Sequence, residues 1–163
     1  MKIIKFCFKF FIFLILVNIE TNLSANIESK IVVRVENQIV SSYELKNKIK
    51  TLLLLTNQEI NQKNINFTKE RALSQLINYK LKKNEITKAN IEVKNDNQIN
   101  SYLKNISSRF QTDLSGMKKI FENNDVNFDL YYDEVKTEFK WQKLIFELFG
   151  NKINLDENEV NNE

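Results

Sequence analysis

The sequence predicts a mainly α-helical domain that begins with a short β-hairpin and continues through about five helices, the last of them long. Three observations carry this prediction. The 163 residues include no proline and only two glycines, so helices meet few local breakers. Apolar residues recur at helical spacing from Leu45 to Phe149. Before them, residues 31–36 are rich in β-branched side chains that alternate from Val33 onward, as in a strand.

The hairpin is expected to turn at residues 36–38, where Asn37 is the residue that best tolerates a positive φ. A second short strand then leads to Ser41 and Glu44, which fit a capping box, and Ser42 is an alternative cap. This box starts a first helix that reaches about Leu55. A two-stranded ribbon is marginal alone, so we expect it to pack on helices.

The remaining helices are placed by their apolar periods and by capping residues. Residues 57–66 are polar without such a period and are expected to form a loop. Thr68 is then expected to cap a second helix to about Asn84, and residues 85–93 to connect it to a third that begins near Asn95. The last two helices are expected to begin at Thr112 or Asp113 and at Asn127, with Gly150 ending the long one.

The first 25 residues have the three parts of a secretory signal peptide. A basic start precedes an apolar run over residues 6–17 and small or polar residues up to Ala25. The run is shorter than the roughly 20 residues that span a bilayer, and an uncleaved membrane anchor is the alternative. We therefore expect residues 26–152 to form one domain in the periplasm. Residues 153–163 are a tail or the start of a following segment. The only cysteine, Cys7, lies in the leader.

The residue types needed for catalysis are largely missing. The chain contains no histidine, the usual general base and metal ligand. Asp125, Asp129 and Asp133 recur at helical spacing, but such a stripe is more typical of a solvated acidic face near a helix N-terminus. We therefore expect no enzymatic activity, cofactor or metal. The formal net charge is only +3 and the lysines alternate with acids, which argues against nucleic acid as a partner.

The long last helix is apolar on two faces, so both must be covered. One face carries Phe128, Tyr131, Tyr132, Val135, Phe139, Phe146 and Phe149. The second carries Trp141, Leu144 and Leu148, with Ile145 between the two. The second face is covered either by the hairpin or first helix, or by a missing C-terminal segment or an unfolded polypeptide. In the latter case the expected peptide-binding residues are Tyr131, Trp141, Leu144, Ile145 and Leu148.

Three stretches resemble the SurA family of periplasmic chaperones. They are VVRVENQIVSSYEL at 32–45, RALSQLINYKL at 71–81 and FDLYYDEVK at 128–136. Residues 153–160 are similar to the junction that leads to the next domain in that family. The resemblance lies in the order and spacing of these stretches over residues 26–160, since no one of them is diagnostic alone.

The resemblance implies a trigger-factor/SurA peptide-binding fold and an ATP-independent chaperone module. Such a module binds unfolded outer-membrane proteins on their way to assembly. Longer members add parvulin-type prolyl isomerase domains and a C-terminal segment that completes the N-terminal core. Two alternatives stay open: the N-terminal part of such an isomerase, whose catalytic domain lies outside this chain, and a membrane-anchored periplasmic scaffold.

Overall fold

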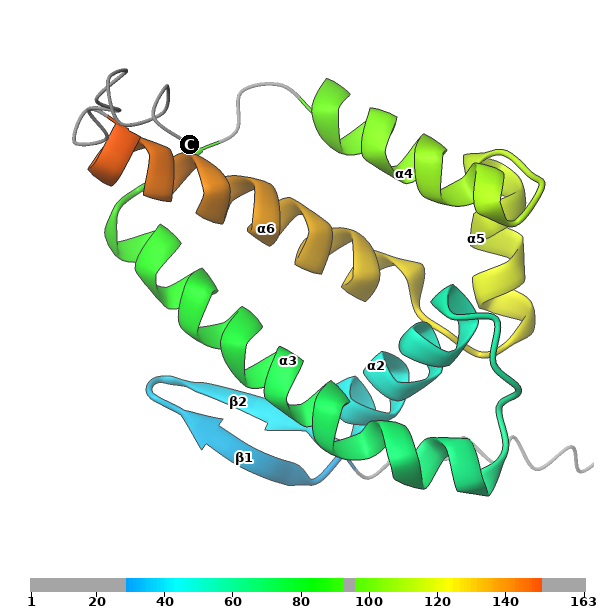
Figure 1. Ribbon diagram of the computed structural model, residues 1–163. Helices are drawn as coiled ribbons and strands as arrows, with labels where there is room; N and C mark the ends of the chain where they lie inside the picture. The colour runs from blue at the N-terminus through cyan, green and yellow to red at the C-terminus, as the bar shows by residue number, and fades with distance from the viewer. Residues whose placement is uncertain (1–28, 93–95, 151–163) are drawn as a thin grey trace, which may run out of the picture.

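The computed structural model describes residues 29–92 and 96–150, and the architecture there is the predicted one (Figure 1). A short antiparallel hairpin precedes five helices, and the last helix is long. In order, the elements are β1 (Ile31–Val35), β2 (Gln38–Ser41), α2 (Ser42–Leu55), α3 (Gln62–Lys88), α4 (Asn97–Arg109), α5 (Leu114–Asn123) and α6 (Phe128–Phe149). The predicted leader, the tail and the expected helix start near Asn95 lie outside the described residues.

The hairpin packs one face on the helices, with Val35 and Val40 buried. Its strands are antiparallel, and their register shifts between Ile31 and Val33. The predicted turn is present, but Glu36 and not Asn37 takes the positive φ, at 51°. The carboxylate of Glu36 accepts a hydrogen bond from Asn84 Nδ2 at 2.8 Å, which ties this turn to α3.

Local capping starts α2, α5 and α6 where the sequence predicts. Ser41 and Glu44 form the expected capping box, in which Glu44 N donates to Ser41 Oγ and Ser41 N donates to Glu44 Oε2. Asp113 caps α5 and Asn127 caps α6 through their side-chain oxygens. Gly150 is the C-cap of α6 as expected, although its φ of −57° is right-handed.

The helix α3 is longer at both ends than the sequence predicts. The loop expected over residues 57–66 ends at Asn61, whose side chain accepts from Asn64 N at 3.0 Å and caps the helix. Thr68 is therefore not a cap: it lies within α3 and is 2% exposed. The connection expected from Glu85 is also wrong, because the helix continues to Lys88 so that Ile86 is buried.

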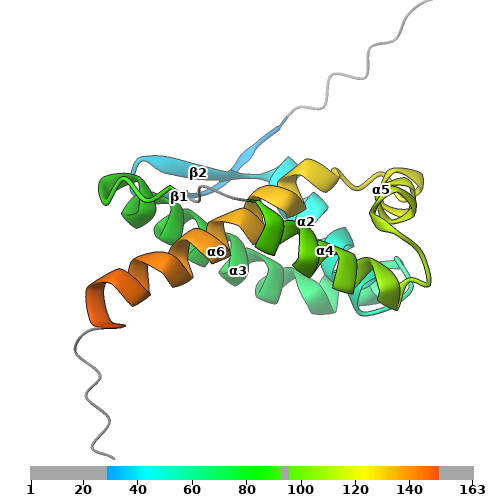
Figure 2. The same cartoon turned by 90° about the horizontal axis from the view of Figure 1, so that it is seen from above.

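The helix α6 is shared by two layers. The hairpin, α2 and α3 lie on one side of it and α4 lies on the other, while α5 lies beyond its N-terminal end (Figures 1 and 2). One core cluster joins the hairpin, α2 and α3, and a second joins α4, α5 and the first half of α6. A third, small cluster lies where α3 ends beside the second half of α6. Within the described residues, no helix combines the length and apolar character needed to cross a membrane.

Candidate functional site

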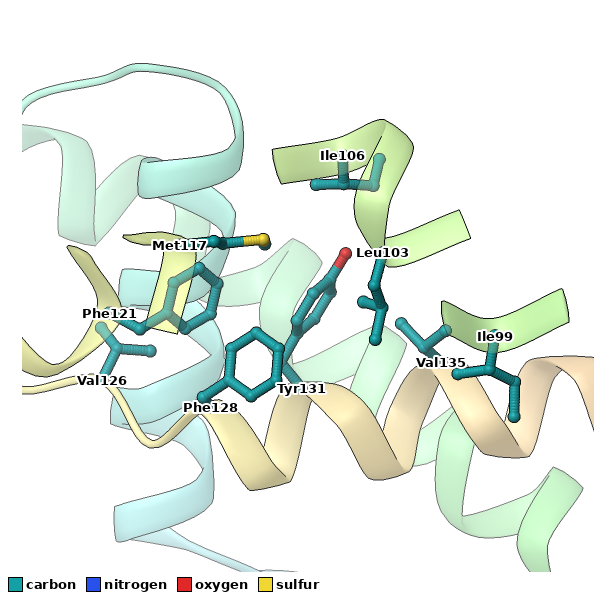
Figure 3. Packing of buried hydrophobic residues seen from close by; sticks show 9 residues of the cluster. All are labelled: Ile99, Leu103, Ile106, Met117, Phe121, Val126, Phe128, Tyr131 and Val135. Atoms are coloured by element: carbon teal, nitrogen blue, oxygen red, sulfur yellow. The ribbon is translucent and has the colours of Figure 1, made fainter. Parts of the chain in front are cut away.

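The first half of α6 is core. Phe128 and Tyr131 lie with Phe121 of α5 in a group of three rings whose centroids are 5.3 to 6.0 Å apart (Figure 3). Tyr131 is 6% exposed, and burial raises the pKa of its hydroxyl. Tyr131 was expected to contact a bound peptide, but the structure places it inside the domain.

The opposite side of the same half is joined to α2 and α3 by charged side chains. Lys48 of α2 forms an ion pair with Glu134, and burial raises the pKa of the Glu134 carboxyl despite this partner. Asp133 accepts from Lys83 Nζ at 2.6 Å and from the hydroxyl of Tyr79. Lys48 and Glu134 are largely withdrawn from water, and charged groups in such surroundings need a partner. The first half of α6 is therefore fixed on both sides.

The Asp133 contacts shift two groups in opposite directions. Burial, followed by the hydrogen bond to Asp133, raises the pKa of Tyr79 to about 12. Burial alone would raise the pKa of Asp133, but the hydrogen bonds from Lys83 and Tyr79 outweigh it and hold that pKa below its ordinary value. Asp133 therefore has two polar partners on α3 within the domain. Asp125 precedes α6 with a φ of 51°, and the described residues contain no cluster of three or more potential His, Cys, Asp or Glu ligands.

The second half of α6 is held by a much smaller contact. Leu144 is buried with Ile86 and Ile91, and Trp141 packs against this group. Lys82 Nζ lies 5.7 Å from the centre of the Trp141 ring. The second apolar face is thus covered partly by the end of α3 and by Ile91. The hairpin and the first helix were expected as one possible cover of this second face, but neither belongs to this cluster.

Beyond this contact, α6 exposes four large apolar side chains in its last turns. We call this surface the α6 apolar end, and it consists of Ile145 (37% exposed), Phe146 (74%), Leu148 (52%) and Phe149 (48%). It lies where α6 runs out of the bundle (Figures 1 and 2). With apolar groups and no titratable centre, such a surface can bind by burial of apolar area.

The five residues expected to bind peptide do not form one surface. Ile145 and Leu148 lie on the α6 apolar end, and Trp141 is half-buried beside it. Leu144 and Tyr131 are buried in two separate clusters.

Sequence reasoning missed Phe146 and Phe149 as surface residues, because the helical wheel grouped them with the packed Phe128. The signal was present in residues 144–149, where five of six side chains are apolar and leave almost no polar face before Gly150. Such a helix end is exposed unless another segment covers it.

Comparison with known proteins places the chain in a family. The family model of the SurA N-terminal domain matches residues 29–145. The match runs from the residues just before β1 to the first residue of the α6 apolar end. No curated protein matches the chain.

Proposed function

The chain belongs to the SurA N-terminal domain family, and from this premise we propose that it binds unfolded outer-membrane proteins as an ATP-independent chaperone. The family is one of chaperone-type modules without catalytic activity. Our proposal adds the class of client and the compartment. In this proposal residues 1–25 direct export to the periplasm, residues 26–152 form the binding domain, and residues 153–163 are a tail or the start of a following segment.

The observation that carries this proposal is the α6 apolar end. Exposed apolar residues scattered singly are ordinary, but four within five positions at the end of one helix form a contiguous patch, and such patches mark interaction sites. Two of the four are phenylalanines, which offer large apolar area without directional polar demands. A surface of this kind accepts many different sequences, as a chaperone for unfolded chains requires.

The binding would need no nucleotide. The two glycines of the chain, Gly116 and Gly150, are 34 positions apart, so no glycine-rich loop cradles a phosphate. Release of the client would instead follow from the modest affinity of a surface patch, since each apolar side chain buried contributes only about 1.5 to 3 kcal/mol.

The test is suppression of aggregation. An outer-membrane porin unfolded in urea is diluted into buffer with the purified chain lacking the leader, and light scattering is followed. We expect suppression at near-stoichiometric ratios and its loss when Phe146→Ser is combined with Leu148→Ser. Phe67→Ser is the matched control, because Phe67 is 87% exposed on α3 and lies outside the α6 apolar end. Equal suppression by both variants, or none by the folded wild type, would contradict the proposal.

Two alternative functions can be distinguished from the proposed one by simple measurements. Sequencing the gene beyond Glu163 tells whether a parvulin-type isomerase domain follows, as in longer members of the family. N-terminal sequencing of the exported protein separates a cleaved leader, with a start at Asn26, from an anchored scaffold.

A further inference from the structure

A second surface lies between α2 and the first turns of α3, far from the α6 apolar end. Its floor consists of Leu45, Ile49 and Ile65, and the first two are only 6% exposed. The cavity has a volume of about 300 Å³. Ile65 lies 21 residues before Ile86, which packs beside the second half of α6. At 1.5 Å per residue the two surfaces are about 30 Å apart along α3.

The rim of this groove is positively charged. Lys46, Lys50 and Lys69 line it, and no acidic residue is among the described residues that do so. Lys50 is already engaged, since its Nζ donates to the carbonyl oxygen of Asn124 at 2.8 Å and lies 3.5 Å from Asp125 Oδ2. Lys46 and Lys69 are exposed. We call this surface the lysine-rimmed groove.

The walls of the groove are built in advance of any ligand. Leu45 and Ile49 belong to the core cluster of the hairpin, α2 and α3, and Ile65 packs against that cluster. The wall from α3 is fixed by the Asn61 cap and by a 2.8 Å hydrogen bond from Gln62 Nε2 to Asn66 Oδ1. A preformed site loses little conformational entropy when a partner binds.

We propose that the lysine-rimmed groove binds an acidic amphipathic segment of a partner polypeptide, in which aliphatic side chains alternate with Asp or Glu. The aliphatic groups enter the cavity, whose volume is at the low end for ligand sites and suits one or two side chains. The flanking carboxylates approach Lys46 and Lys69. The same charges disfavour a basic segment, so the groove selects by repulsion as well as by attraction.

The test uses fluorescence anisotropy with two fluorescein-labelled peptides, one of alternating glutamate and leucine and one of alternating lysine and leucine. We expect the purified chain lacking the leader to bind the acidic peptide at least tenfold more tightly than the basic one. Lys46→Glu combined with Lys69→Glu should lower the acidic peptide's affinity at least tenfold. Asn66→Trp, a change at the exposed rim that fills the groove, should lower it without altering net charge.

The matched control is Lys104→Glu with Lys119→Glu, which changes the net charge equally on the exposed faces of α4 and α5. Its affinity for the acidic peptide should stay within twofold of the wild type. Equal losses in both double variants would overturn the proposal, as would equal binding of the two peptides. Tighter binding after removal of residues 151–163, which carry four acidic residues, would assign the groove to the chain's own tail and also overturn it.

Failure of the groove proposal can be distinguished from failure of the proposed chaperone function. The groove variants leave the α6 apolar end intact, and the Phe146→Ser and Leu148→Ser pair leaves the groove intact. We therefore expect the latter pair to bind the acidic peptide as the wild type does. A loss of peptide binding in that pair would place the peptide on the α6 apolar end and overturn the proposal.

Discussion

The two halves of α6 both carry many large apolar side chains, but their surroundings are opposite. In the first half Phe128, Tyr131 and Val135 are buried, and the acidic side chains Asp133 and Glu134 have partners on α3 and α2. In the last turns only Leu144 is buried, and the apolar residues after it are exposed. Residues 139–149 contain seven apolar side chains and residues 128–138 contain five, so the more apolar half is the more exposed one and hydrophobicity alone does not decide burial.

The two halves differ in how they are packed within the described residues. The first half passes between α3 and α4, whereas the last turns run beyond the two larger clusters and contact the end of α3 and the segment that follows it (Figure 1). One helix therefore contributes core contacts at its start and an exposed apolar surface at its end. Segments with few buried contacts open at low free-energy cost, so the last turns are also expected to exchange their amide hydrogens first.

The largest effect we expect is that of a cavity in the core beside the first half. Phe121→Ala removes a side chain that is 0% exposed and contacts the rings of Phe128 and Tyr131. Loss of such a phenylalanine costs about 3 to 5 kcal/mol of the free energy of unfolding. Urea unfolding followed by circular dichroism measures it. Phe67→Ala, at an exposed position, should cost less than about 0.5 kcal/mol. Similar losses of unfolding free energy in the two variants would mean that the core beside the first half of α6 contributes no more to stability than an exposed position does.

The next effect concerns the ion pair that holds the first half to α2. Lys48→Met leaves Glu134 buried without its partner, and removal of one member of a buried pair costs about 3 to 5 kcal/mol. The pair is only partly buried, so we expect the lower end. Because burial already raises the pKa of Glu134, the loss should shrink as the pH falls and the carboxyl is protonated. The double variant Lys48→Met with Glu134→Leu should recover most of the stability at neutral pH. A loss that does not depend on pH would contradict this account.

The parts of the fold that the sequence predicts correctly are those specified locally. The capping box of Ser41 and Glu44 and the caps at Asp113 and Asn127 each depend on residues within three positions. The first turns of α3 could not be predicted in this way. Residues 62–66 contain one apolar side chain, Ile65, and its packing against the core cluster of α2 and α3 is a tertiary contact. That missed segment forms one wall of the lysine-rimmed groove.

The sequence predicted only part of the candidate site, and the reason is related. A helical wheel gives the direction of each side chain but not the point along the helix at which its neighbours stop. It therefore placed Phe146 on the same face as Phe128 and Tyr131, although Phe146 is exposed and the other two are buried. The Lys48–Glu134 pair joins residues 86 positions apart, and no local pattern indicates such a contact.

The pH dependence of the free energy of unfolding tests how the Asp133 carboxylate contributes to stability. Its pKa is lowered in the folded state from the ordinary 3.8, so the stability that it contributes is present above that value and is lost as the pH falls through the lowered pKa. We expect Asp133→Asn to flatten the fall in unfolding free energy below about pH 4. Asp129→Asn, at an exposed position of the first turn of α6, is the control and should keep the wild-type profile. An unchanged profile for Asp133→Asn would mean that Lys83 and Tyr79 do not act through this carboxylate.

The smallest effect is expected at the α6 apolar end, and it is the most informative for function. Phe146 is 74% exposed in the folded chain, so Phe146→Ser has little burial to lose. The free energy of unfolding should change by less than about 0.5 kcal/mol, whereas aggregation of the porin should no longer be suppressed when Leu148→Ser is added. A destabilisation above about 1 kcal/mol would mean that this end is covered in solution. Its apolar character would then serve the fold, and the two halves of α6 would have the same role.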